Sequence, residues 1–348
     1  MKKIVFNGFI FAQKKTGVYR VAREILKEFD KIVYSERYEL LIPEYAENIP
    51  DLKNIKITYY GKCRGVLWEQ ISLVQYLRKN NGIAVSFNNV MPILSPGIIF
   101  IHDICYKIHS EYYNTFRGKL SVLWHRLNFR LAYLYKIPIA TVSFFSKYQL
   151  IDNYKINPNK ITVVGCGWQH MNEFYSDSDV LEKYKLKEKS FFFTLGSIAI
   201  NKNTSWIYKV AEKNPQYEFV IAGGKSNNDK LNMNIDNRNI KFLGYISDKE
   251  IKILMQKCKA FVFPSFYEGF GLPPLEALSQ GAKIIISNTA SLPEIYKNSA
   301  YYIDPYNAEV DLDSLMREDV DNPYNVLKNY SWKKSAKELK KFIEKNTR

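Results

Sequence analysis

The sequence contains no apolar run long enough to cross a membrane. Its longest candidate, residues 92–101, is about half the roughly 20 residues that a spanning helix needs, and it contains Pro96 and Gly97. The first residues are also unlike a secretory signal, because Asn7 and Gly8 interrupt their apolar run. A first strand explains that segment better. We therefore expect a protein that does not span a bilayer.

Cysteines are few, and none is paired in a motif. The 348 residues include four cysteines, which lie far apart without a Cys-x-x-Cys pair: Cys63, Cys105, Cys166 and Cys258. This spacing excludes a zinc-ribbon or dithiol motif and favours reduced cytoplasmic thiols in core positions. Asp-x-Asp spacings at 177–179, 311–313 and 319–321 resemble metal-binding carboxylates. They fall in expected linker and C-terminal loops, so we expect no bound metal.

Acidic residues are scarce in the first half of the chain. Residues 1–170 contain 24 Lys and Arg against 12 Asp and Glu, whereas the remainder contains 26 against 23, within a net charge of +15. A basic half suits an anionic partner, either nucleic acid or anionic lipid, although a solvated lysine-rich surface is the alternative. The basic residues are dispersed and no nucleic-acid-binding module is recognisable, so we expect no nucleic acid.

The chain is long enough for two domains, and its pattern predicts two parallel sheets. Short apolar runs alternate with amphipathic stretches, which is typical of doubly wound α/β domains. The alternation weakens between 165 and 190, where we place a boundary. We expect one domain over 1–168, a second over 169–330, and a final helix within 331–348 that packs back on the first domain.

One segment joins a buried strand to a helix with carboxylates on both sides. The strand 260–263 leads into the turn 264–271, and prolines then open a helix at Leu272. Such a helix start suits an anion or a sugar hydroxyl. Glu276 can accept from a ribose diol, and Glu268 can bind a hexose and stabilise positive charge at its anomeric carbon. A capping glutamate and a surface glutamate are the alternative.

The spacing Glu268-x7-Glu276, followed by Gly281 to Glu294, resembles the GT-B glycosyltransferases of family 4. Further matching segments occur in the family's order: Gly17 to Arg20, Ile101-His102-Asp103, Thr141 to Ser146, Val163 to Gly165, Leu195-Gly196-Ser197, Asn201 to Asn203, and Phe242 to Ile246. The resemblance implies two Rossmann-like domains facing across a cleft, the first on the acceptor side and the second binding a nucleotide sugar.

The resemblance also implies roles for individual residues. Lys202 matches the lysine that clamps the donor diphosphate, and His102, beside Asp103, matches the histidine that contacts the donor sugar. A structural histidine is the alternative. Other matching positions are expected to bind the donor: Gly17, Ser197, Gly244, Tyr245, Gly269, Phe270, Gly271 and Leu272. The arginine that often precedes the clamping lysine is replaced here by Asn201.

The segment Trp168-Gln169-His170 is similar to that of bacterial rhamnosyltransferases that build capsule or O-antigen units. Trp168 could stack on a sugar and His170 could donate to a hydroxyl, although a buried tryptophan is the alternative. The resemblance thus predicts retaining, metal-independent transfer without a cofactor, with dTDP-rhamnose as the first choice of donor and GDP-mannose as the second.

The expected acceptor is a glycan linked to polyprenyl diphosphate, on the cytoplasmic face of an anionic membrane. A nucleotide-sugar epimerase with the same fold and a basic nucleic-acid-binding protein are the alternative functions.

Overall fold

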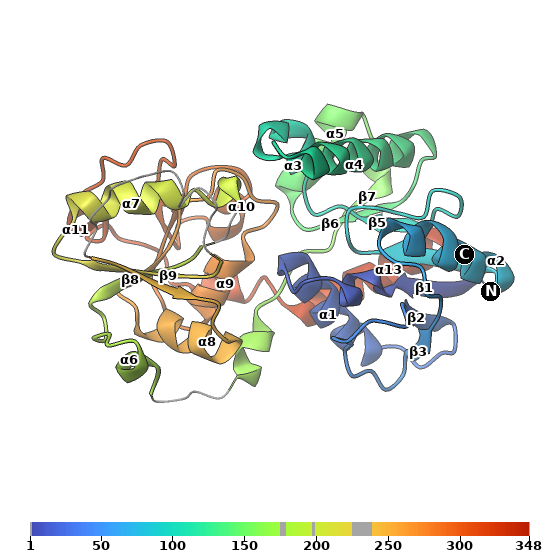
Figure 1. Cartoon of the computed structure of the whole chain (residues 1–348), viewed down its shortest axis with the longest axis horizontal. Coiled ribbons are helices and arrows are strands. Elements are labelled where there is room, and N and C mark those ends of the chain that lie inside the picture. The colour runs from blue at the N-terminus through green and yellow to red at the C-terminus, as the bar shows by residue number, and fades with distance from the viewer. Residues whose placement is uncertain (1, 175–178, 197–198, 225–238, 348) are drawn as a thin grey trace. The chain divides into compact units, whose positions relative to one another are not determined.

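The protein, for which we describe a computed structural model, is divided into two compact units. The structure describes residues 2–174, 179–196, 199–224 and 239–347. Unit 1 comprises Met1–Cys166 and Ser331–Arg348, and unit 2 comprises Gly167–Tyr330. Each unit is built around its own sheet with helices against it (Figure 1).

Unit 1 contains a parallel sheet of seven strands in the order β3-β2-β1-β4-β5-β6-β7. The strands are Lys3–Asn7 (β1), Tyr38–Ile42 (β2), Lys56–Tyr59 (β3), Gly82–Ser86 (β4), Ile98–Phe100 (β5), Ile139–Thr141 (β6) and Ile161–Val163 (β7). Its central strands are apolar on both faces, as expected for a parallel sheet covered by helices on both sides. The strand order reverses between β1 and β4, where the chain passes from one half of the sheet to the other.

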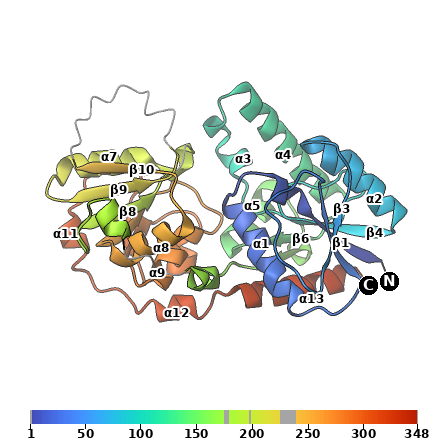
Figure 2. The ribbon, with the colours of Figure 1, turned by 60° about the horizontal axis from the view of Figure 1, so that its bottom comes forward.

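The helices of unit 1 are Gly17–Asp30 (α1), Leu73–Lys79 (α2), Cys105–Ile108 (α3), Phe116–Leu134 (α4), Phe144–Tyr154 (α5) and Trp332–Asn346 (α13). α1 begins because the Thr16 hydroxyl accepts from the amide of Tyr19, and it buries an apolar face. α13 packs against α1 within this unit, as Figure 2 shows beneath the sheet. Arg37 holds the end of α13 by donating to the Thr347 hydroxyl over 2.7 Å.

Unit 2 contains a parallel sheet of six strands in the order β10-β9-β8-β11-β12-β13. The strands are Phe191–Leu195 (β8), Glu218–Ala222 (β9), Ile240–Gly244 (β10), Ala260–Phe263 (β11), Ile284–Ser287 (β12) and Tyr301–Ile303 (β13). The helices are Val180–Lys183 (α6), Thr204–Lys213 (α7), Asp248–Lys257 (α8), Leu272–Ser279 (α9), Leu292–Tyr296 (α10), Leu312–Leu315 (α11) and Tyr324–Leu327 (α12). α7 packs Trp206 and Val210 against the sheet core.

The structure confirms the predicted α/β class with two doubly wound parallel sheets. Ser247 and Glu250 form the reciprocal N-terminal cap expected of their spacing. The first strand is shorter than the apolar run suggests, since it ends at Asn7. There the side chain of Asn7 accepts from the amide of Phe9 and starts a 3₁₀ turn. Within the described residues, no helix is both long and apolar enough to cross a membrane.

Candidate functional site

The carboxyl edge of the unit 2 sheet brings two distant loops together. β8 and β11 are neighbours in the sheet although two strands separate them in the sequence, so the strand order reverses there. In open α/β sheets, ligands bind at such a reversal, beside the carboxyl ends of the strands. The loop after β8 carries Lys202, and the loop after β11 carries Glu268.

Lys202 and Glu268 form an ion pair at this reversal. The Lys202 Nζ donates to Glu268 Oε1 over 2.6 Å, and the two side chains are 23% and 12% exposed. The same ammonium lies 4.8 Å from the centre of the Phe263 ring, a cation–π distance. The pair is partly shielded yet open enough for a ligand to reach. An anionic ligand would compete with Glu268 for the lysine.

Asparagines fix the two loops against each other. Asn201 accepts from the amide of Phe266 over 2.8 Å through its carbonyl and donates to Tyr267 O over 3.2 Å through its side chain. Asn203, whose φ of +52° is in the left-handed region, donates to Pro264 O over 3.0 Å. The residue at the position of the expected arginine therefore connects the loops and positions Lys202.

The turn before α9 depends on a glycine. Gly271 has a φ of +82°, and a Cβ there would lie 2.4 Å from Leu292 Cδ2. Pro273 and Pro274 follow in the first turn of the helix. Because proline has no N–H, these two positions cannot donate to an anion. An anion at this helix start would therefore depend more on Lys202 than the sequence indicated.

Glu276 lies in α9 beside a histidine from the start of unit 2. Its Oε1 is 2.8 Å from His170 Nε2, and the histidine side chain is fully buried. A carboxylate oxygen can only accept, so Nε2 carries the proton. The contact fixes Oε1 and leaves Oε2 as the oxygen available to a ribose. Sequence reasoning placed His170 against a sugar, whereas the structure gives it Glu276 as a partner.

The other donor positions predicted in unit 2, and Trp168, which was predicted to stack on a sugar, lie around the same edge or nearby. Gly244, with a φ of +67°, ends β10, and the ring of Tyr245 after it is highly exposed. Phe270 is buried, with its ring edge-to-face against Tyr330 at 5.3 Å, and Gly269 and Leu272 flank it in the turn. The indole of Trp168 donates to Leu327 O over 3.1 Å. Ser197 lies outside the described residues.

His102, Asp103 and Gly17 belong to unit 1. His102 follows β5, is buried, and donates from Nε2 to Phe87 O over 2.7 Å. Burial lowers its pKa to about 4, against the opposing effect of that hydrogen bond, so the imidazole is neutral with Nδ1 as an acceptor. Asp103 accepts from the amide of Cys105, and Gly17 is the first residue of α1, with open space where a Cβ would stand.

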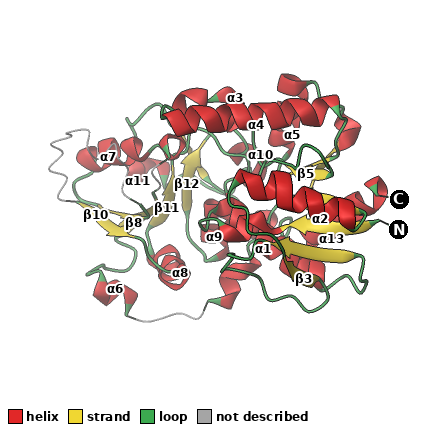
Figure 3. Cartoon of the chain, turned by 45° about the vertical axis from the view of Figure 1, so that its right-hand side comes forward, coloured by secondary structure: helices red, strands yellow, loops and turns green. Residues whose placement is uncertain are grey.

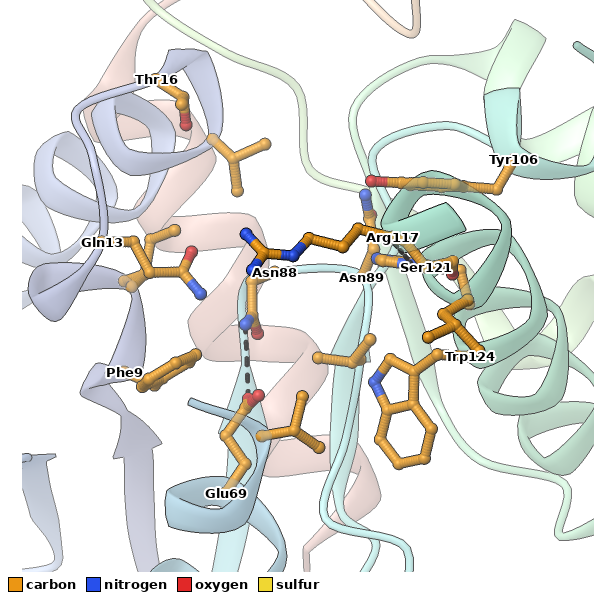
Figure 4. A pocket seen from close by; sticks show the side chains of 16 residues that line it. Phe9, Gln13, Thr16, Glu69, Asn88, Asn89, Tyr106, Arg117, Ser121 and Trp124 are labelled. Carbon is orange, nitrogen blue, oxygen red and sulfur yellow. Dashed lines mark hydrogen bonds between the residues drawn. The ribbon is translucent and has the colours of Figure 1, made fainter. Parts of the chain in front are cut away.

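Unit 1 has a pocket at its own reversal of strand order, beside the ends of β1 and β4. The pocket volume is about 630 Å³. Figure 4 shows Phe9 and Gln13 entering it from the segment after β1, Glu69 from below, Arg117 reaching across from α4, and Trp124 closing one side. Further polar residues of the lining are Thr16, Asn88, Asn89, Tyr106, Ser121 and His125. Aromatic rings next to amides and a carboxyl are the groups that bind sugars.

Glu69 is the buried acid of this pocket. It accepts from Asn7 Nδ2 over 2.7 Å and from Asn88 Nδ2 over 3.3 Å. Burial raises its pKa to about 7, more than these two hydrogen bonds lower it. Among the described residues, Trp124 Nε1 and Asn88 Oδ1 are buried without a hydrogen-bond partner. A donor and an acceptor in the pocket lining thus remain for a polar ligand.

Sequence reasoning missed this pocket. Its one available signal is Glu69 itself, the single acidic or basic residue within the segment 66–77. A buried acid in an apolar helix is a candidate functional group. The partnership of His170 with Glu276 was equally hidden, since 106 residues separate them.

Comparisons with known proteins relate the chain to glycosyltransferases. Residues 176–338 match the family described as glycosyl transferases group 1. The chain is 29% identical to O-antigen chain mannosyltransferase B of Escherichia coli, covering 88% of each protein. It is 27% identical to the O-antigen chain mannosyltransferase RfbU of Salmonella typhimurium, covering 70% of this chain and 68% of that protein.

A solved structure shows the same fold. The crystal structure of Anabaena HepE in complex with UDP and glucose superposes with a TM-score of 0.73 at 15% identity, covering 99% of this chain and 100% of that one. The likeness covers both Rossmann-like units. The match to the group 1 glycosyl transferases covers just under half of the chain, and the likeness to the solved structure shows that the chain has the GT-B fold.

Proposed function

We propose that this glycosyltransferase moves mannose from GDP-mannose, with retention of configuration, to a lipid-linked glycan in cell-surface polysaccharide synthesis. The observation that carries the proposal is the Lys202–Glu268 pair, 2.6 Å apart where the strand order of unit 2 reverses. A cation and a carboxylate at one such edge suit two adjoining parts of a nucleotide sugar, its diphosphate and its hexose.

The names of the relatives favour mannose over the rhamnose predicted from the sequence. Two proteins that the chain resembles over most of its length are named O-antigen mannosyltransferases. The basis for rhamnose was the segment containing Trp168 and His170. Both side chains have partners inside unit 2, which gives that segment a structural role independent of the sugar.

In the proposed reaction, Lys202 turns from Glu268 to the donor diphosphate and stabilises the charge that grows as the C1–oxygen bond breaks. Glu276 accepts from the ribose through Oε2, with Oε1 fixed by His170. Glu268 then binds the hexose. The acceptor hydroxyl forms the new bond to C1 from the side that the phosphate leaves, and its proton passes to the leaving phosphate oxygen. No metal is required for this step.

We further propose that the pocket of unit 1 binds the terminal sugar of the acceptor. Phe9 and Trp124 offer ring faces and an indole N–H, while Asn88 and Glu69 accept from hydroxyls. Arg117 extends into the pocket and can bind a phosphate or hydroxyl oxygen. A lipid-linked acceptor would place the enzyme at the cytoplasmic face of an anionic membrane, in keeping with its basic first half.

Thermal denaturation with nucleoside diphosphates tests the donor. A ligand present at 100 times its Kd stabilises the native state by about 2.7 kcal/mol, which corresponds to a Tm increase of roughly 5 °C or more for a domain of this size. We expect GDP to produce this increase and dTDP and UDP to produce little. Stabilisation by dTDP alone would overturn GDP-mannose as the donor.

A further inference from the structure

The outer face of α4 exposes a continuous apolar stripe. The side chains of Phe116, Leu120, Leu123, Leu127 and Leu134 are 78%, 52%, 66%, 42% and 59% exposed. Their spacing of three, four and seven residues places them along one line of a helix. Figure 3 shows α4 as a long helix at the outside of its unit, with α3 and α5 next to it. An ordinary surface helix would carry polar side chains along this line.

The chain segment that carries the stripe has charges of one sign. Residues 112–151 contain no Asp or Glu but six basic residues, namely Arg117, Lys119, Arg126, Arg130, Lys136 and Lys147. Lys119 and Arg130 lie beside Leu123 on the helix surface. Among the described residues, none forms an ion pair with either of these two side chains. An exposed apolar line flanked by unpaired cations is complementary to an anionic lipid surface.

The neighbouring side of the same helix reaches the pocket. Arg117, Ser121, Trp124 and His125 line the pocket from α4, and Leu120 belongs both to its rim and to the stripe. The inner face buries Phe129 and Ala132 against the unit 1 core. One rigid element therefore carries the apolar stripe and a wall of the pocket.

We propose that this face of α4 lies on the surface of an anionic bilayer. The side chains of the stripe would reach the boundary between headgroups and acyl chains, and the cations would contact the headgroups. The inference rests on the proposed lipid-linked acceptor, because it explains how the head of such a molecule reaches the pocket. Docking through α4 places the pocket next to the membrane, so the acceptor need not leave the bilayer.

Vesicle flotation of the full-length protein tests the surface. We expect the protein to float with vesicles of phosphatidylcholine and phosphatidylglycerol at low salt, and much less with phosphatidylcholine alone. The variant Leu123→Gln/Leu127→Gln should bind about tenfold or more weakly for each leucine removed from the interface. The variant Lys119→Glu/Arg130→Glu should bind at least about 30-fold more weakly, and high salt should remove the difference between the two vesicle types.

Matched controls come from unit 1 itself. Leu94 is as exposed as Leu123 but lies off the stripe, so Leu94→Gln should leave flotation unchanged. Lys53→Glu/Lys56→Glu reverses two charges just before and at the start of β3, an edge strand at the other end of the sheet order from β6 and β7. A GDP thermal shift equal to that of the original protein shows that each variant is folded. GDP binding also separates the membrane proposal from the donor proposal. If the protein binds GDP but does not float with vesicles, only the membrane proposal is refuted.

Two results overturn the inference. In the first, the substitutions in α4 and the control substitutions reduce flotation by the same amount. In the second, the original protein does not bind vesicles but forms a concentration-dependent dimer, and Leu123→Gln/Leu127→Gln converts this dimer to a monomer. The stripe would then bind a second copy of the chain. If the protein floats with the vesicles but neither it nor any variant binds GDP, the membrane-binding face of α4 is supported and GDP-mannose as the donor is refuted.

Discussion

Replacing Lys202 with alanine tests the proposed site in unit 2. The substitution removes the ammonium that lies 2.6 Å from Glu268 Oε1. If Lys202 stabilises the departing diphosphate, its loss should lower kcat by about 100- to 1,000-fold, the typical effect of removing one preorganised electrostatic group. The carboxylate left behind adds an uncompensated negative charge next to the diphosphate, so the Kd for GDP should also rise, by about tenfold or more.

The effect on stability should be smaller than the effect on catalysis. Hydrogen bonds to charged groups contribute about 1.5–3 kcal/mol when shielded, whereas exposed ion pairs contribute about 0–1 kcal/mol. The Lys202 and Glu268 side chains are 23% and 12% exposed, between these limits. We therefore expect Lys202→Ala to lower the free energy of unfolding by about 1–2 kcal/mol, measured by urea denaturation.

The control is an ion pair in the same unit that lies away from the site. Lys213 and Glu309 pair with exposures of 42% and 76%. Lys213→Ala should change stability by about 0.5 kcal/mol or less and leave kcat and the GDP Kd unchanged. Lys202→Arg should retain part of the activity because it keeps the charge.

The double variant Lys202→Ala/Glu268→Gln separates the two contributions to binding. Removing the carboxylate charge should restore part of the GDP affinity that Lys202→Ala loses, while kcat stays low because Glu268 is itself assigned to the hexose. The reasoning is refuted if Lys202→Ala keeps kcat within a factor of three of the original, or if Lys213→Ala loses as much.

Three further predictions concern other parts of the two units. Burial raises the pKa of Glu69 from 4.5 to about 7, so the native state should lose about 3 kcal/mol of stability as pH rises through this range. The variant Glu69→Gln should not show this loss. The difference in unfolding free energy between the original protein and the variant should level off above pH 7. His170→Phe should leave Glu276 without its donor, raising the GDP Kd in calorimetry about five- to tenfold and lowering stability by about 1–3 kcal/mol; an unchanged Kd would remove His170 as a positioning residue. Gly271→Ala should destabilise more than Gly281→Ala by about 1–3 kcal/mol in denaturant titrations, because both have φ near +80° but only the first brings a Cβ to 2.4 Å from a leucine methyl; equal losses would contradict the close contact.

The fold could be predicted from the sequence because its determinants are local. Alternating apolar runs specify the strands of both sheets, and the Ser247–Glu250 cap and the prolines after Gly271 specify where two helices begin. Each of these signals lies within a few residues, and all of them agree with the tertiary structure. The end of β1 was misjudged because an apolar run does not reveal that Asn7 caps a 3₁₀ turn.

The side-chain partners in the site could not be predicted in the same way. Lys202 and Glu268 are 66 residues apart, and only the adjacency of β8 and β11 brings their loops together. Glu276 was expected to accept from a ribose diol, and a buried histidine already occupies one of its two oxygens. Glu69 was missed because its partners, Asn7 and Asn88, lie on other strands and loops. Such contacts depend on strand order, which the local pattern does not encode.

The most direct test is the product formed from GDP-mannose. The purified protein is incubated with GDP-mannose and a glycan acceptor that carries a hydrophobic lipid, and NMR of the new glycosidic carbon reports its configuration. We predict release of GDP and a new α-mannosyl linkage, the configuration of the donor, with Lys202→Ala showing the loss described above. A β-linkage, or transfer from dTDP-rhamnose but not from GDP-mannose, would contradict the proposed reaction.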